Sequence, residues 1–310
     1  IAYDARLGGR YRFFRDPAVL ASPLGTRYVG DMDRMFDTYA ELVPRLTDFF
    51  REAHPKYPDD SDFVYRQAIR AKAFDALRGL LPAASLSNVG IYGSGQGYEA
   101  LLLRLKSLQL PEANAYADLM LTELRKVIPS FLKRVDLPDR GGAWSNYLAT
   151  NNQAMAEVAA KVFPTVGAPE DKSSVTLVDF DPDAEIKTVA AMLYPYCHEP
   201  EEQIEDRVRE MTVDERITVM KAYVGDRTNR RHKPGRALER SFYRFDVLSD
   251  YGAFRDLQRH RMMTIEWQAL TPYHGYIRPD SVDAAGARDM FDETMERSAN
   301  LYRDLSANFP

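Results

Sequence analysis

Residues 239–276 read ERSFYRFDVLSDYGAFRDLQRHRMMTIEWQALTPYHGY, and the rest of the chain is organised around this stretch. Its first part alternates apolar and polar residues with the period of a half-buried strand, and the apolar positions are Tyr243, Phe245 and Val247. Residues 251–262 then have the pattern of a helix, for which Ser249 is the expected N-cap. The stretch is therefore predicted to form a strand, a short turn and a helix.

The predicted helix ends in three consecutive side chains that can carry positive charge: Arg259, His260 and Arg261. Successive helical residues point about 100° apart, so the three cannot share one face and form a fan of hydrogen-bond donors. Such a fan suits a ligand with several phosphates, or a flavin with its pyrophosphate. The alternative is a solvated basic helix end that interacts favourably with the C-terminal dipole.

This block as a whole resembles the flavin-dependent thymidylate synthases, which carry an Arg-His-Arg signature followed by a short substrate loop. The matching residues are Glu239, Phe242, Phe245, Gln258, Arg259, His260 and Arg261, with Thr264 where the family usually has Ser. The resemblance implies that Arg259, His260, Arg261 and Thr264 bind the cofactor FAD.

The chain departs from the family pattern where the nucleotide should bind. The family pairs its strand Glu with a His, whereas this chain has Arg240. The acidic, Ser and Arg positions that bind deoxyuridylate in the family fall near Trp267, Ala269 and Thr271. The chain therefore has the Arg-His-Arg triplet of the family but lacks the residues of its nucleotide-binding loop.

A second region of resemblance covers residues 77–106. The family's Arg-x-x-Leu-Pro segment begins here with Arg78, and a nucleotide-binding helix Arg of the family lines up with Lys106. The resemblance implies that Arg78 and Lys106 bind the nucleotide phosphate. The family's Asn-x-Arg turn, which contacts flavin, is replaced by Gly95 and Gly97.

The glycines at positions 90, 93, 95 and 97 also admit two interpretations that need no family resemblance. They form either a tight turn that leads into a helix or a phosphate-binding loop. They do not fit the G-x-G-x-x-G fingerprint of dinucleotide-binding proteins, and the α/β repeat that accompanies it is missing.

Elsewhere the apolar pattern is mainly helical. Amphipathic helices are predicted over residues 32–50, 62–80, 111–133 and 212–224, and a second strand opens the segment SVTLVDFDPDAE at 174–185. Pro44 is expected to kink or split the first of these helices. Thr212 and Glu215 form a predicted capping box, and the Gly-, Pro- and Arg-rich residues 1–30 are predicted as an extended arm or loop.

A short internal echo predicts the domain organisation. Met35-Phe36-Asp37 recurs as Met290-Phe291-Asp292, and each copy lies near the start of a long amphipathic helix. Both copies fall between the signature loop and the Arg-x-x-Leu-Pro segment of the family pattern. The chain is therefore predicted to join the back part of one synthase-like repeat, residues 1–165, to the front part of a second, residues 174–310. A linker is placed near 165–173, and the start at Ile1 suggests a fragment.

Composition limits the remaining possibilities. A chain of 310 residues with 45% hydrophobic and 28% charged residues is typical of a globular protein of one or two domains. The net charge of −5 disfavours bulk nucleic-acid binding. The basic run at 226–236 is either a solvated loop or a local phosphate contact. Cys197 is the single cysteine, which predicts a cytoplasmic protein without an internal disulfide. We predict no metal site, and no apolar run approaches the roughly 18 residues of a membrane helix.

The resemblance also implies a fold and a reaction. The fold would be α+β, with a twisted, mainly antiparallel sheet, packed helices and a homo-oligomeric assembly. The reaction would methylate dUMP to dTMP with methylenetetrahydrofolate, FAD and NADPH. We predict no catalytic side chain, because the flavin carries most of the chemistry. The departures from the family pattern in the loop 264–271 and at Gly95 and Gly97 predict impaired turnover. The alternatives are a non-catalytic flavin-binding, nucleotide-binding or architectural repeat protein, and a nucleic-acid binder that the acidic charge disfavours.

Overall fold

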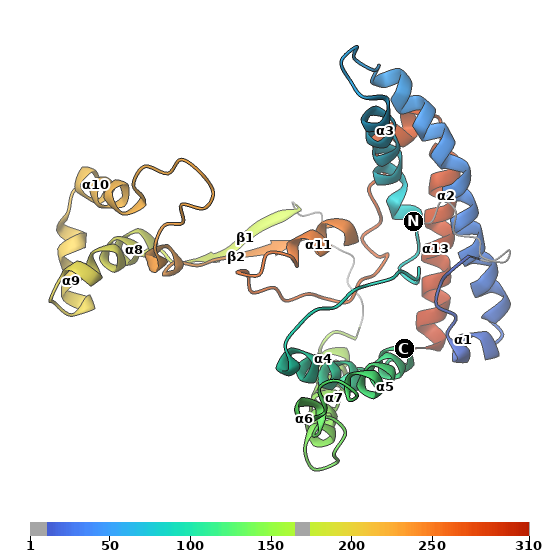
Figure 1. Ribbon diagram of the computed structural model, residues 1–310, viewed down its shortest axis with the longest axis horizontal. Coiled ribbons are helices and arrows are strands. Elements are labelled where there is room, and N and C mark those ends of the chain that lie inside the picture. Colours follow the sequence, from blue (N-terminus) through green and yellow to red (C-terminus); the bar gives the residue numbers. More distant parts are fainter. Residues whose placement is uncertain (1–10, 165–173, 310) are drawn as a thin grey trace. The chain divides into compact units, whose positions relative to one another are not determined.

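The computed structural model describes residues 11–164 and 174–309. In these ranges the protein is mostly helical, with one small antiparallel sheet of two strands (Figure 1). This combination is compatible with the α+β class. The chain divides into two compact units, one formed by residues 1–169 with 269–310 and the other by residues 170–268. The predicted linker at 165–173 lies outside the described residues, and the segment 269–310 belongs to the first unit.

The first unit contains helices from both ends of the chain. They are α1 (Pro17–Ala21), α2 (Gly25–Ala53), α3 (Asp62–Leu77), the 3₁₀ turn η1 (Arg78–Leu80), α4 (Gly95–Ser107), α5 (Pro111–Leu124), α6 (Pro129–Leu132), α7 (Gly141–Val162), α12 (Asp280–Ala284) and α13 (Arg288–Asn308).

The longest of these helices, α2, forms one wall of the main hydrophobic core. Its apolar face includes Phe36, Leu42 and Leu46, each at most 1% exposed, and it packs with Phe291 and Leu301 of α13. The helix continues past Pro44, so the predicted split does not occur. It also begins at Gly25, and α1 covers Pro17–Ala21, so the prediction of an extended arm or loop over residues 1–30 is wrong at these two helices. Tertiary contacts explain this difference, because Tyr28 is buried and its hydroxyl donates to the Phe14 carbonyl at 2.6 Å.

The two copies of the Met-Phe-Asp echo make similar contacts with a tyrosine. The Tyr11 hydroxyl donates to Asp37 Oδ1 at 2.7 Å, and the Tyr11 and Phe36 rings stack with centroids 4.7 Å apart. In the second copy, the Tyr276 hydroxyl donates to Asp292 Oδ1 at 2.8 Å, and the Tyr276 and Phe291 centroids lie 6.0 Å apart. Each aspartate of the echo therefore accepts a tyrosine hydroxyl, and each phenylalanine contacts the ring of the same tyrosine.

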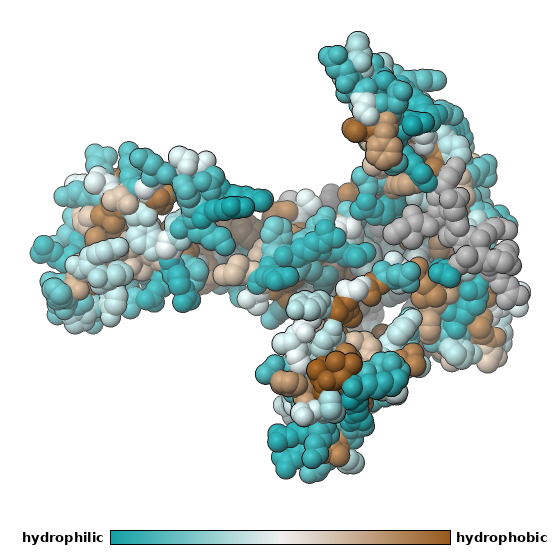
Figure 2. All heavy atoms as spheres, viewed as in Figure 1, coloured by the Kyte–Doolittle hydropathy of each residue, from teal (hydrophilic) through white to brown (hydrophobic). Residues whose placement is uncertain are grey.

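A second cluster joins α4, α5 and α6. Leu102, Leu121, Leu132 and Val135 are each at most 4% exposed in its interior. The single helix predicted over 111–133 is wrong here, because α5 ends at Leu124 and α6 begins at Pro129. The residue before a proline avoids helical dihedrals, and Ile128 has φ −127° and ψ 52°. Figure 2 shows apolar patches where these helices reach the surface, and Leu119 and Val127 are 64% and 78% exposed.

The second unit contains the sheet and a small group of helices. Its elements are β1 (Val175–Phe180), α8 (Ala184–Leu193), the 3₁₀ turn η2 (Tyr194–Tyr196), α9 (Glu201–Glu210), α10 (Val213–Val224), the 3₁₀ turn η3 (Arg236–Glu239), β2 (Tyr243–Val247) and α11 (Tyr251–Leu257). Both predicted strands are confirmed, and they pair antiparallel with Val175 opposite Val247 and Leu177 opposite Phe245. The capping box of Thr212 and Glu215 is also confirmed.

The helix after β2 is shorter than predicted. Its N-cap is Asp250 and not Ser249, since Asp250 Oδ1 accepts the Ala253 N–H at 3.0 Å. It ends at Leu257, and the amides of Arg259 and His260 bond three residues back, with His260 donating to the Leu257 carbonyl at 3.0 Å. This tighter pattern is common where a helix terminates. None of the helices in the described ranges is long and apolar enough to cross a membrane.

A network of hydrogen bonds connects the start of α13 to the segment before it. Arg278 donates to Asp283 Oδ1 at 2.6 Å and to Asp292 at 2.7 Å. Burial and the hydrogen bond to Asp292 raise the pKa of Tyr276 to about 12. The hydrogen bonds from Tyr276 and Arg278 lower the pKa of Asp292 from its ordinary value of 3.8.

We expect these shifts to make the free energy of unfolding fall at both ends of the pH range. The Asp292 contribution is present above the unfolded pKa near 3.8 and is lost as the pH falls through the lowered folded value. The Tyr276 contribution is complete below about pH 10 and is lost as the pH rises toward about 12. Urea denaturation at a series of pH values should show a shallower acid decline for Asp292→Asn and a shallower alkaline decline for Tyr276→Phe. Variant curves parallel to wild type would contradict this assignment.

Candidate functional site

The cationic triplet lies in the turn that follows α11, not in the helix itself. Arg259, His260 and Arg261 are all exposed, and the Met263 N–H donates back to the His260 carbonyl at 3.1 Å. The Arg259 guanidinium contacts the Asp256 carboxylate at 3.0 Å, and both side chains are about 70% exposed. Exposed ion pairs of this kind contribute little to stability, so the pair leaves Arg259 available to an anionic ligand.

An exposed apolar surface adjoins the triplet in the sequence. Met262 is 84% exposed and Trp267 is 63% exposed. The Trp267 ring lies tilted against Phe254 of α11, with centroids 5.7 Å apart, so the loop folds back onto the helix. Thr264, the fourth residue of the predicted flavin site, is exposed in the same loop. The second unit therefore presents cations and large apolar side chains together within residues 254–267.

Arg78 lies in η1 with its side chain 67% exposed, and it forms an ion pair with Asp75 of α3. Two cavities in the described ranges, of about 420 and 440 Å³, are lined by other residues. Arg78 thus faces solvent in an exposed ion pair of the same weak kind as that of Arg259, and the pair leaves it available to an anion.

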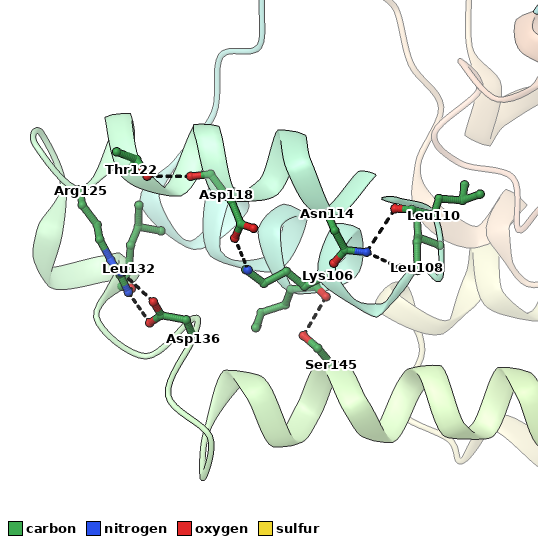
Figure 3. Close-up of polar contacts among 11 residues, drawn as sticks. Lys106, Leu108, Leu110, Asn114, Asp118, Thr122, Arg125, Leu132, Asp136 and Ser145 are labelled. Carbon is green, nitrogen blue, oxygen red and sulfur yellow. Dashed lines mark hydrogen bonds and ion pairs between the residues drawn. The ribbon is translucent and has the colours of Figure 1, made fainter. Parts of the chain in front are cut away.

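Lys106 lies within a set of polar contacts between α4 and α5 (Figure 3). Its ammonium contacts Asp118 Oδ1 at 2.5 Å, and its side chain is 21% exposed. Arg125 and Asp136 form a second ion pair nearby, with Arg125 Nη1 donating to Asp136 Oδ2 at 2.8 Å, and this bond lowers the pKa of Asp136. The charge of Lys106 is already balanced, so a phosphate would have to displace Asp118 to bind it.

The glycine turn leads directly into α4. Ser94 is its N-cap and accepts the Gly97 N–H at 3.1 Å. A Cβ on Gly95 would lie 2.5 Å from the Phe131 ring, too close for any side chain unless the ring moves. The turn therefore has no room at Gly95 for the asparagine that flavin-dependent thymidylate synthases carry there. The geometry matches the interpretation as a turn that leads into a helix.

The cavities offer different chemistry. One of about 420 Å³ lies between α2 and α13 and is lined by Asp33, Asp37, Glu41 and Glu293 with Arg34, so it would repel a phosphate. The other, of about 440 Å³, is an open depression beside Arg125 and Lys133. No group of three or more His, Cys, Asp or Glu side chains in the described ranges could hold a metal ion.

The residues predicted from the sequence divide between the two units. Arg259, His260, Arg261 and Thr264 belong to the second unit, where the structure brings them together in one turn and loop. Arg78 and Lys106 belong to the first unit. The sequence analysis did not identify Met262, or the contact between Trp267 and the half-buried Phe254, as part of the site. A signal for Met262 was present, since Met262 and Met263 directly follow the cationic triplet.

Comparison with known proteins gives relatives without a described activity. The whole chain aligns with the UPF0159 protein of Chlamydia muridarum at 35% identity over 311 residues, 59% of that protein. It aligns with a UPF0159 protein of Chlamydia pneumoniae at 35% identity over 314 residues, 58% of that protein, and with one of Thermoplasma acidophilum at 28% over 334 residues, 64% of it. The chain thus spans about three fifths of the length of these relatives. No protein-family model and no solved structure matches the chain.

Proposed function

We propose that this protein is a flavin-dependent thymidylate synthase-like protein that binds FAD through Arg259, His260, Arg261 and Thr264. The observation that carries the proposal is the turn after α11, where these four residues are exposed beside Trp267. FAD has an anionic pyrophosphate, which suits the arginines of this surface, and a flat aromatic ring system, which suits the apolar side chain of Trp267. Charge-assisted hydrogen bonds to the pyrophosphate contribute on the order of 1.5–3 kcal/mol each.

The proposed reaction transfers a one-carbon unit from methylenetetrahydrofolate to dUMP, with NADPH as reductant, and yields dTMP. The chain's own residues would bind and orient, since the flavin supplies the redox chemistry. Arg78 and Lys106 are the proposed phosphate ligands of the nucleotide. Lys106 is 21% exposed and already pairs with Asp118, so a phosphate must displace that carboxylate, and this competition supports impaired turnover.

Two further features support impairment. Trp267 and Thr271 stand where a carboxylate and a guanidinium hold deoxyuridylate in the flavin-dependent synthases, and neither can make those contacts. Gly95 and Gly97 donate no side-chain hydrogen bond to the flavin ring. Misplacing the reacting carbon is costly, because alignment supplies about 7–11 kcal/mol of barrier reduction in well-oriented systems.

The proposal extends to the fold and the assembly. We infer two related, incomplete units that share a sheet-and-helix plan with a twisted, mainly antiparallel sheet, in a cytoplasmic homo-oligomer. The similar contacts of Asp37 and Asp292 support the repeat. Asp37 lies on α2 and Asp292 on α13, and each accepts a hydrogen bond from a tyrosine hydroxyl. The single Cys197, which is not in a disulfide, is compatible with a reducing compartment.

The second candidate is a non-catalytic flavin-binding, nucleotide-binding or architectural repeat protein. The close approach of Phe131 to Gly95 favours it, since the structure uses that turn for packing between α4 and α6. A protein of this kind would bind flavin or nucleotide but would form no dTMP.

The test combines an absorbance spectrum with a turnover assay on the full-length protein. Bound flavin gives bands in the visible, and addition of NADPH, methylenetetrahydrofolate and dUMP should yield slow formation of dTMP. Flavin binding without dTMP would favour the non-catalytic candidate. Turnover equal to that of an ordinary flavin-dependent synthase would refute the impairment. Absence of flavin binding at millimolar concentration would refute the site.

A further inference from the structure

The two-stranded sheet of the second unit has one apolar face and one polar face. The register places six apolar side chains, each 42–61% exposed, on the same face: Val175, Leu177, Phe180, Tyr243, Phe245 and Val247. The paired residues Thr176 with Asp246, and Asp179 with Arg244, lie on the other face. A sheet of two strands is marginally stable by itself in water, so this ribbon needs a further strand or a covering surface.

In the described ranges, the outer edge of β2 has no backbone partner. The Leu248 N–H donates to the Ser174 carbonyl at 2.9 Å, which makes these two residues a hydrogen-bonded pair between the strands. Such pairs alternate along an antiparallel ladder, so the amides and carbonyls of Tyr243, Phe245 and Val247 point away from β1. In the described part of the chain, none of these backbone groups bonds to a residue outside the ribbon.

The charges on β2 are self-complementary. Arg244 and Asp246 are the neighbours of Phe245 along the strand, and both lie on the polar face. When two copies of this strand align antiparallel about Phe245, each Arg244 stands opposite Asp246 of the second copy, and Tyr243 stands opposite Val247. A parallel, in-register alignment would instead place Arg244 opposite Arg244 and Asp246 opposite Asp246. Opposite charges directly across a strand pair stabilise it, and like charges destabilise it.

We propose that β2 pairs antiparallel with β2 of a second copy of this chain, about a two-fold axis at Phe245, to form a continuous four-stranded sheet. The pairing satisfies the three outward amide and carbonyl pairs of each strand with about six backbone hydrogen bonds. It also aligns the two apolar faces and buries part of the Phe245 ring against its counterpart. A closed, isologous contact of this kind ends with two copies and does not propagate. The proposal does not depend on flavin binding.

Charge reversal tests the pairing. Asp246→Arg places Arg opposite Arg244, and Arg244→Asp places Asp opposite Asp246, so each single variant creates two like-charge contacts across the axis. Light scattering after gel filtration of the full chain should show each variant at half the mass of wild type, with association at least about tenfold weaker. A mixture of the two variants should recover the wild-type mass, because every cross-strand pair in the mixed species is again Arg with Asp.

The control is Asp179→Asn, which removes the ion pair of Arg244 within the same ribbon, at 3.2 Å, and should leave the mass unchanged. A monomeric wild type, variants that keep the wild-type mass, or a mixture that stays dissociated would each overturn the proposal. The last two outcomes would point to face-to-face packing of the ribbon or to coverage by another segment.

A cross-link provides a second measurement that needs no change in charge. In a Cys197→Ser background, Phe245→Cys should form a disulfide between copies under mild oxidation, since directly paired residues have Cα atoms about 5.5 Å apart. Tyr243→Cys should not, because its counterpart lies four residues away along the strand, at about 13 Å. Cross-linking at both positions, or at neither, would contradict the proposed register.

Discussion

Replacing Arg259 and Arg261 together by alanine should weaken FAD binding by about 10²–10⁴-fold. Two charge-assisted hydrogen bonds to the pyrophosphate would be lost, each on the order of 1.5–3 kcal/mol, and every 1.4 kcal/mol is about a factor of ten in affinity. Both side chains lie on an exposed turn, so their removal should leave the fold intact. The measurement is a titration of the full-length protein with FAD, followed by absorbance or flavin fluorescence.

The matched control is Arg255→Ala. Arg255 lies in α11 of the same unit, and its guanidinium lies over the Tyr251 ring at 5.8 Å from the centroid. Its removal takes away one positive charge, against two in the double variant, without touching the turn. A loss of binding free energy in the control of about half that in the double variant would reduce the effect to net charge. An unchanged affinity in the double variant would show that FAD does not bind at this turn.

Phe36→Ala and Phe291→Ala should each lower the free energy of unfolding by about 3–5 kcal/mol, the usual cost of emptying a buried aromatic site. The two rings are 1% and 2% exposed and belong to the same core. Each contacts the ring of a tyrosine, Tyr11 or Tyr276, so each loss also removes an aromatic contact. Chemical denaturation of the full chain, monitored by circular dichroism, measures both values.

The control for this pair is Phe63→Ala. Phe63 is 64% exposed near the start of α3, so its truncation should change the free energy of unfolding by less than about 0.5 kcal/mol. If Phe291→Ala were as mild as the control, α13 would not be an integral part of the core. The repeat hypothesis would then lose its structural support at the second copy of the echo.

Several elements were predictable because their signals are local. The strand at 243–247 follows from the alternation of apolar and polar residues, and the start of α10 follows from the capping box at Thr212 and Glu215. Errors arose where the decisive contact is remote or where two weak signals compete. Asp250 and not Ser249 caps α11, and the helix ends at Leu257, so the cations lie in a turn and not on a helix face.

The candidate site shows the same division. The order strand, helix and Arg-His-Arg is fixed by adjacent residues, and it could be read from the sequence together with the identity of each side chain. The ion pair of Lys106 could not be predicted from the sequence, because its partner Asp118 lies twelve residues further on, in the next helix. The demand for glycine at position 95 likewise depends on Phe131, which approaches only after α4 and α6 pack.

Local patterns were enough to predict the helices over 32–50 and 62–80, both strands and the cationic triplet, since these depend on neighbours within a few residues. The packing of α13 against the core of α2, and the exposure of the apolar face of the β1–β2 ribbon, could not be predicted in this way. Burial depends on which segments meet in space. Periodicity states which face of an element is apolar, and packing decides which of those faces is covered.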